Sequence, residues 1–142
     1  MKNNSLREKL DNNKIILVPG IYDSFGALMA EKAGFEALYV SGASISYTKL
    51  GSPDLGFVSM SEVAAIVGNI SERTSLPLIV DADTGFGNAL NVQRTIKVFE
   101  KAGASAIQIE DQLLPKRCGH LDGKTLITGQ EMCGKIKAAL DS

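Results

Sequence analysis

The sequence predicts an α/β protein with a parallel sheet, built from four strand–helix units in succession. Short apolar runs alternate along the chain with segments whose apolar residues recur at helical spacing. The tetrapeptide Glu-Lys-Ala-Gly also occurs twice, at 31–34 and 100–103, each time two residues before an apolar run. A glycine that ends a helix just before a strand, in the same register both times, indicates a repeated helix–strand connection.

Four apolar runs are the expected strands. They lie at 14–18, 37–40, 78–80 and 106–109. The first run is continuous and stops at Pro19-Gly20, which predicts a strand buried on both faces. Strands that alternate with helices require right-handed crossovers and a parallel sheet. Four such units form a small open sheet, or half of an eight-unit barrel, which typically needs about 250 residues.

The helices are expected between these strands. Asp23 or Ser24 caps the first helix, and capping boxes at 59–62 and 128–131 begin the second and the last. A loop of about fifteen residues, long for a connection, is expected between the second strand and Ser59. The predicted buried stripes of the four helices are Phe25, Leu28, Met29 and Ala33; Val63, Ile66, Val67 and Ile70; Val92, Ile96 and Phe99; and Met132, Ile136 and Leu140.

Composition and length argue against a nucleic-acid-binding, a membrane-spanning or a disulfide-rich protein. The 142 residues form one expected domain, and 15 basic against 16 acidic residues give a net charge of −1, without a basic field for nucleic acid. No apolar run approaches the roughly 20 residues that span a bilayer, and the N-terminus lacks the apolar stretch of a signal peptide. Two cysteines, Cys118 and Cys133, cannot build a disulfide framework, so a cytoplasmic location is expected.

Acidic residues follow two neighbouring strands, where parallel α/β folds place their function. Asp81 and Asp83 end the third strand on the same side, because side chains alternate with a period of two. Glu110 ends the fourth strand in phase with Gln108. Three carboxylates without His or Cys favour Mg²⁺ or Mn²⁺. The alternative is that the two aspartates cap the next helix, which needs only one acid.

The segment Lys116-Arg117-Cys118-Gly119-His120 follows the fourth strand. A thiol flanked by two basic residues and the single histidine of the chain is typical of a reactive cysteine. A lone cysteine is more often a small buried apolar residue. The loop position and the basic neighbours favour the reactive interpretation for Cys118, whereas Cys133, within a helix beside Met132, is interpreted as buried and structural.

Taken together, these motifs resemble the isocitrate lyase/phosphoenolpyruvate mutase superfamily. The Lys-Arg-Cys-Gly-His run is most similar to its 2-methylisocitrate lyase branch. The resemblance implies a (β/α)₈ barrel of which residues 1–142 form the N-terminal half, and a homo-oligomer. The motifs that carry it are Asp81–Gly87, Ile109–Gln112 and Lys116–His120, with Tyr39–Ala43 and Pro53–Gly56 as matches to substrate-binding segments.

The resemblance also implies roles for individual residues. Asp83 would bind Mg²⁺ or Mn²⁺ directly, and Asp81 and Glu110 through water. Cys118 would protonate a succinate carbanion. Its helpers would be Lys116, Arg117 and His120, with Tyr39 near the substrate alkoxide. The implied substrate-binding residues are Ser41, Gly42, Ala43, Asp54 and Gly119, although the family usually has a glycine where Ala43 stands.

The implied reaction is magnesium-dependent carbon–carbon cleavage of a 2-hydroxy tricarboxylate, such as 2-methylisocitrate, to succinate and a 2-oxo acid. One alternative within the superfamily is oxaloacetate decarboxylation, or phosphonopyruvate or phosphoenolpyruvate mutase chemistry. Another alternative is a truncated half-barrel without catalysis, because the family's second half supplies an arginine, a glutamate and a swapped helix. The expected binding partner of this chain is a small-molecule substrate, a di- or tricarboxylate.

Overall fold

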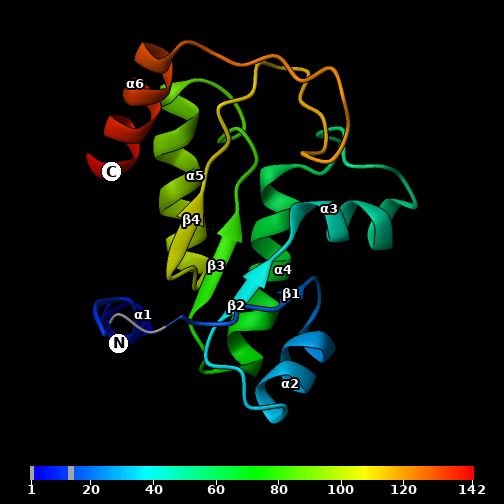
Figure 1. Cartoon of the computed structure of the whole chain (residues 1–142), viewed down its shortest axis with the longest axis vertical. Coiled ribbons are helices and arrows are strands. Elements are labelled where there is room, and N and C mark those ends of the chain that lie inside the picture. The colour runs from blue at the N-terminus through cyan, green and yellow to red at the C-terminus, as the bar shows by residue number, and fades with distance from the viewer. Residues whose placement is uncertain (1, 13–14) are drawn as a thin grey trace.

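A single parallel sheet organises the chain. The computed structural model describes residues 2–12 and 15–142. Four strands lie in the order β1 (Gly20–Ile21), β2 (Leu38–Val40), β3 (Leu78–Asp81) and β4 (Ala106–Gln108). Each strand pairs in parallel with the next one along the chain, and the carboxyl ends point toward the long loops in Figure 1. The α/β prediction with a parallel sheet is therefore confirmed.

Helices lie before, between and after the strands, and the longer helices between strands cover one face of the sheet (Figure 1). The helices are α1 (Lys2–Asp11), α2 (Ser24–Lys32), α3 (Gly42–Ile45), α4 (Met60–Arg73), α5 (Ala89–Ala102) and α6 (Gly129–Leu140), and α3 continues into a π-helical turn η1 (Ser46–Leu50). The predicted capping box of Ser59 and Glu62 begins α4. Helix α4 packs between α2 and α5, and α6 packs beside α5 (Figure 1). Over the described residues, no helix has both the length and the apolar character to cross a bilayer.

Burial alternates along the central strands. Leu38, Val40, Leu78 and Val80 are fully buried and belong to the apolar core with residues of α4 and α5. The intervening residues of β2 and β3 are less covered, because their side chains leave the sheet on the opposite face. That second face therefore carries Tyr39 and Asp81 toward the carboxyl ends of the strands.

The prediction for the first strand is wrong in position. The side chains of Ile15 and Leu17 are 95% and 73% exposed, and the ladder begins only at Gly20. Lys14 lies outside the described residues. Because β1 is an edge strand with β2 on one side only, the apolar run before it has no second neighbour to cover it.

Three helical predictions also need correction. In α2 the buried residues are Ala27 and Ala30, while Phe25 and Met29 are exposed, because the small side chains face α4. The expected loop before Ser59 contains α3 and η1, and α1 has no predicted counterpart. Helix α6 exposes Ile136 and Leu140 of its predicted apolar stripe, leaves Met132 partly buried, and buries Lys135 instead.

The repeated tetrapeptide has the predicted structural basis. Gly34 and Gly103 follow α2 and α5 with φ of 86° and 111°, a left-handed conformation that glycine adopts at little cost. A Cβ at Gly103 would also lie 2.6 Å from the Ser71 side chain of α4. These glycines end their helices and return the chain to the sheet, so that successive strands stop at the same edge.

Candidate functional site

Polar side chains meet at the carboxyl ends of β2, β3 and β4. The Glu110 amide donates to the Asp83 carbonyl oxygen at 2.7 Å, which keeps the segments after β3 and β4 together. Burial and the nearby carboxylates of Asp81 and Glu110 raise the pKa of Tyr39 well above its usual range. Burial, followed by the charge of Asp81, raises the pKa of Glu110, although Lys116 opposes the shift. Tyr39, Asp81 and Glu110 therefore share one electrostatic environment.

The turn after β3 has an unusual backbone. Asp83 and Phe86 have φ of 54° and 58°, in the left-handed region that costs a non-glycine residue about 1–3 kcal/mol. The Asp83 amide donates to Asp81 Oδ1 at 3.0 Å, and the Gly85 amide donates to the Ala82 carbonyl oxygen at 2.8 Å. A Cβ at Gly85 would lie 2.5 Å from Val92 Cγ2, so the turn requires glycine there. Local hydrogen bonds thus fix the direction in which Asp83 leaves the chain.

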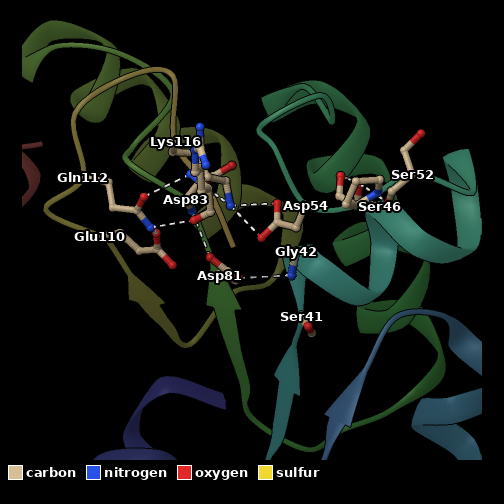
Figure 2. A network of polar contacts seen from close by, with 12 residues as sticks. Ser41, Gly42, Ser46, Ser52, Asp54, Asp81, Asp83, Glu110, Gln112 and Lys116 are labelled. Atoms are coloured by element: carbon tan, nitrogen blue, oxygen red, sulfur yellow. Dashed lines mark hydrogen bonds and ion pairs between the residues drawn. The ribbon is translucent and has the colours of Figure 1, made fainter. Parts of the chain in front are cut away.

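Lys116 inserts its ammonium group between two carboxylates. Its Nζ lies 2.7 Å from Asp54 Oδ1 and 2.6 Å from Asp83 Oδ1, and the lysine side chain is only 2% exposed (Figure 2). Burial alone lowers the pKa of Lys116, but hydrogen bonds and charges from Asp54 and Asp83 raise it above its usual value. Lys116 therefore remains charged and offsets one of the two negative charges of Asp54 and Asp83.

Within the described residues, the buried Oδ1 of the Asp83 carboxylate is paired with the Lys116 ammonium. At 2.6 Å the contact between Lys116 Nζ and Asp83 Oδ1 is a short ion pair, and no other described residue donates a hydrogen bond to that oxygen. Burial raises the pKa of Asp83 to about 6, although Lys116 opposes this shift. A cavity of about 10 Å³, roughly the volume one water needs, lies beside it; its lining includes Gly42, Asp54 and Asp81.

The carboxylate oxygens at the strand ends suit a hard cation, but they do not form a complete coordination site. Among the residues described, no group of three or more His, Cys, Asp or Glu side chains is arranged to hold a metal ion. Asp83 Oδ1 is nevertheless a buried anionic oxygen whose partner within the described residues is the Lys116 ammonium, and it lies next to further carboxylates. Carboxylate oxygens are the ligands that Mg²⁺ prefers. A divalent ion at this position would take the place of the Lys116 ammonium at Asp83.

The predicted substrate-binding residues 41–43, which follow β2, are hydrogen-bonded to the end of β3. Ser41 caps α3, and its Oγ accepts a hydrogen bond from the Ser44 amide at 3.2 Å. The Gly42 amide donates to Asp81 Oδ2 at 3.2 Å, and a Cβ at Gly42 would approach that oxygen to 3.0 Å. Ala43 is the next, partly buried residue of α3. The structure therefore brings this segment and Asp81 together.

Gln112 is a site residue that sequence reasoning missed. It is buried, and its Nε2 donates to Glu110 Oε2 at 2.7 Å and to the Arg117 carbonyl oxygen at 2.8 Å. Its Oε1 accepts a hydrogen bond from the Arg117 amide at 3.0 Å. The available signal was a polar residue two positions after Glu110, on the same face of an extended segment. Gln112 fixes the backbone that carries Lys116.

The predicted basic cluster around the thiol separates in the structure. Lys116 points inward to the carboxylates, whereas Arg117 and His120 are exposed, and so is Gly119. Cys118 is buried, with 6% of its surface exposed. Cys133 is exposed, so the prediction that it is buried is wrong, because α6 turns that face to solvent.

Comparison with known proteins identifies relatives that match nearly the full length of this chain. Residues 6–142 match the family model described as phosphoenolpyruvate phosphomutase. The chain is 53% identical over 135 residues to a 2-methylisocitrate lyase of Aeropyrum pernix, which covers 95% of this chain and 44% of that protein. It is 46% identical over 137 residues to a 2,3-dimethylmalate lyase of Eubacterium barkeri, covering 96% and 47%. The chain thus spans about half the length of these relatives.

Solved structures show the same relationship. A phosphoenolpyruvate phosphomutase from Streptomyces platensis subsp. rosaceus matches with a TM-score of 0.95 and 34% identity, over 99% of this chain and 49% of that one. A phosphonopyruvate hydrolase in complex with oxalate and Mg²⁺ matches with a TM-score of 0.90 and 38% identity, over 99% and 48%. The four parallel strands correspond to about half of such a (β/α)₈ barrel, and the chain belongs to the phosphoenolpyruvate mutase/isocitrate lyase superfamily.

Proposed function

We propose that this chain carries the metal and 2-oxo-acid half of a carbon–carbon lyase site. The substrate is a 2-hydroxy tricarboxylate such as 2-methylisocitrate, cleaved to succinate and a 2-oxo acid. The observation that carries the proposal is the buried anionic oxygen of Asp83, which among the described residues is paired with Lys116 alone and lies beside further carboxylates at the strand ends. The 2-methylisocitrate lyases among the relatives support the substrate class.

The proposed metal is Mg²⁺ or Mn²⁺. Asp83 would bind it directly, with Asp81 and Glu110 acting through bound water. When bound, the ion supplies positive charge that stabilises the oxygen of the developing 2-oxo acid. The hydrogen bonds from the Asp83 and Gly42 amides to Asp81 hold that carboxylate in place and so support the metal half of the site.

Residues of the chain itself would orient the substrate. Within the described structure, the Ser41 hydroxyl accepts from the Ser44 amide, which leaves its own proton for a substrate carboxylate, beside the backbone of Gly42 and Ala43. Tyr39 keeps its phenolic proton because its pKa is raised, so it can donate to the substrate alkoxide oxygen. Asp54 would keep Lys116 in position when the metal takes Asp83.

The thiol segment would complete the reaction. Carbon–carbon cleavage leaves a succinate carbanion, and Cys118 is proposed to give it a proton, with Lys116, Arg117, Gly119 and His120 on the same segment. Phosphonopyruvate or phosphoenolpyruvate chemistry is the second candidate, since relatives with those names match the fold closely. Cys118 favours the lyase, because an enolate stabilised by the metal needs no proton from a thiol.

The metal assignment predicts a graded response to substitution. Asp83→Ala removes the direct ligand and should abolish Mn²⁺ binding, whereas Asp81→Ala removes a ligand that acts through water and should only weaken it. Asp111→Ala, an exposed carboxylate beside Glu110, is the matched control and should bind as the unmodified chain does. Titration calorimetry measures all three, and unchanged affinity in Asp83→Ala would contradict the assignment.

The reaction assignment predicts pyruvate as a product. A fusion of this chain to the second half of the Aeropyrum pernix relative should release pyruvate from 2-methylisocitrate, because the fusion restores a complete barrel. Cys118→Ser in the fusion should remove turnover and leave Mn²⁺ affinity intact. Phosphate release from phosphonopyruvate, without pyruvate release from 2-methylisocitrate, would favour the second candidate instead.

The ion pairs of Lys116 predict a metal-dependent stability. Lys116→Met leaves Asp54 and Asp83 as buried carboxylates without a counter-charge, which should cost about 3–5 kcal/mol of unfolding free energy in EDTA. Mg²⁺ should restore part of that loss because it replaces the missing cation. Lys97→Met, at an exposed position of α5, is the control. Denaturant unfolding with and without Mg²⁺ provides the measurement, and equal stability of Lys116→Met and the unmodified chain in EDTA would contradict the ion pairing.

A further inference from the structure

Lys135 is a buried cation that the proposed reaction does not use. It lies on α6 with 4% of its surface exposed, on a helix whose apolar residues Ile136 and Leu140 are exposed. Its Nζ donates to the Thr84 carbonyl oxygen at 2.9 Å, across 51 residues of sequence. Burying an ammonium group is costly unless hydrogen bonds or an opposite charge compensate it, and the Thr84 carbonyl oxygen supplies such a bond. Lys135 therefore interacts with the turn that contains Thr84, and its role is to be sought there.

That turn is held by side chains from two helices. Thr95 of α5 places its Oγ1 3.1 Å from the Gly85 carbonyl oxygen, next to the carbonyl that Lys135 contacts. The same turn contains the left-handed residues Asp83 and Phe86. Such conformations persist only where the surroundings fix them. Lys135 and Thr95 thus bind the consecutive Thr84–Gly85 and Gly85–Phe86 peptide groups, in the turn that also contains Asp83.

We infer that Lys135 is a positioning residue for the Asp83 carboxylate. Its charged hydrogen bond to the Thr84 carbonyl oxygen holds the Thr84–Gly85 peptide, one residue beyond Asp83, and so restrains the turn from which the Asp83 carboxylate projects toward Lys116 and the small cavity. A charged donor gives a stronger bond to a carbonyl than a neutral one. The role toward a metal rests on the proposed function, whereas the role toward the turn does not.

Hydrogen exchange tests the turn directly. Lys135→Met keeps much of the side-chain volume but removes the donor and the charge. The amides of Gly85 and Glu110, which donate within and beside the turn, should exchange about tenfold faster or more. The amides of β2 and β3 should keep their rates, and Lys135→Arg should restore protection because it retains a charged donor. Lys137→Met, with a side chain 77% exposed on the same helix, is the matched control and should change nothing.

Two exchange results would overturn the inference. Unchanged exchange at Gly85 and Glu110 in Lys135→Met would show that Lys135 does not hold the turn. Uniform acceleration that includes β2 and β3 would make it an ordinary packing residue. If Lys135→Met does not fold, Lys135→Gln, which keeps a neutral donor, replaces it in the same comparison and should show intermediate exchange.

Mn²⁺ affinity, measured by electron paramagnetic resonance on the same samples, tests the link to Asp83. It should fall in Lys135→Met and return in Lys135→Arg. Accelerated exchange without a change in affinity would overturn the role toward Asp83. Absence of Mn²⁺ binding by the unmodified chain would contradict the proposed function alone, because exchange at the turn is measured without metal.

Discussion

The Lys116 ammonium between Asp54 and Asp83 is the interaction on which the rest of the site depends. The three residues come from the segments that follow β4, β2 and β3, so one charged group connects three successive loops. None of these charges is well hydrated, since the Lys116 side chain is 2% exposed and the two carboxylates 10% and 18%. Removing Lys116 would leave two buried carboxylates without a counter-charge, which is far more costly than breaking a surface pair.

The charges of this arrangement also favour the binding of a divalent cation. Two aspartates and one lysine leave a net negative charge, and Glu110 and Asp81 add to it nearby. A divalent ion would satisfy Asp83, while Asp54 could keep Lys116. The strained turn, the Gly42 and Asp83 amides on Asp81, and the Gln112 side chain on Glu110 all hold the carboxylates before any ion arrives. Such preorganisation reduces the reorganisation that binding requires.

Sequence patterns were sufficient for features with local causes. The Ser59 capping box and the left-handed Gly103 follow from spacing over a few residues, and the common edge of Asp81 and Glu110 follows from the parallel order of their strands. The position of β1 was misjudged because an apolar run does not indicate whether a strand has a second neighbour. The inward direction of Lys116 was not predictable either, since its partner Asp54 lies 62 residues away and basic residues in loops are usually solvated. Lys135 was missed for the same reason, because a lysine on a helix is ordinarily exposed.

The most direct test of the central claim is an anomalous diffraction map of the chain crystallised with Mn²⁺. The claim is that a divalent cation replaces Lys116 as the partner of the Asp83 carboxylate, at the carboxyl ends of β3 and β4. It predicts one strong peak within coordination distance of the Asp83 carboxylate, with Lys116 still paired to Asp54. A map in which the contact between Lys116 and Asp83 persists and no peak lies beside Asp83 would contradict it.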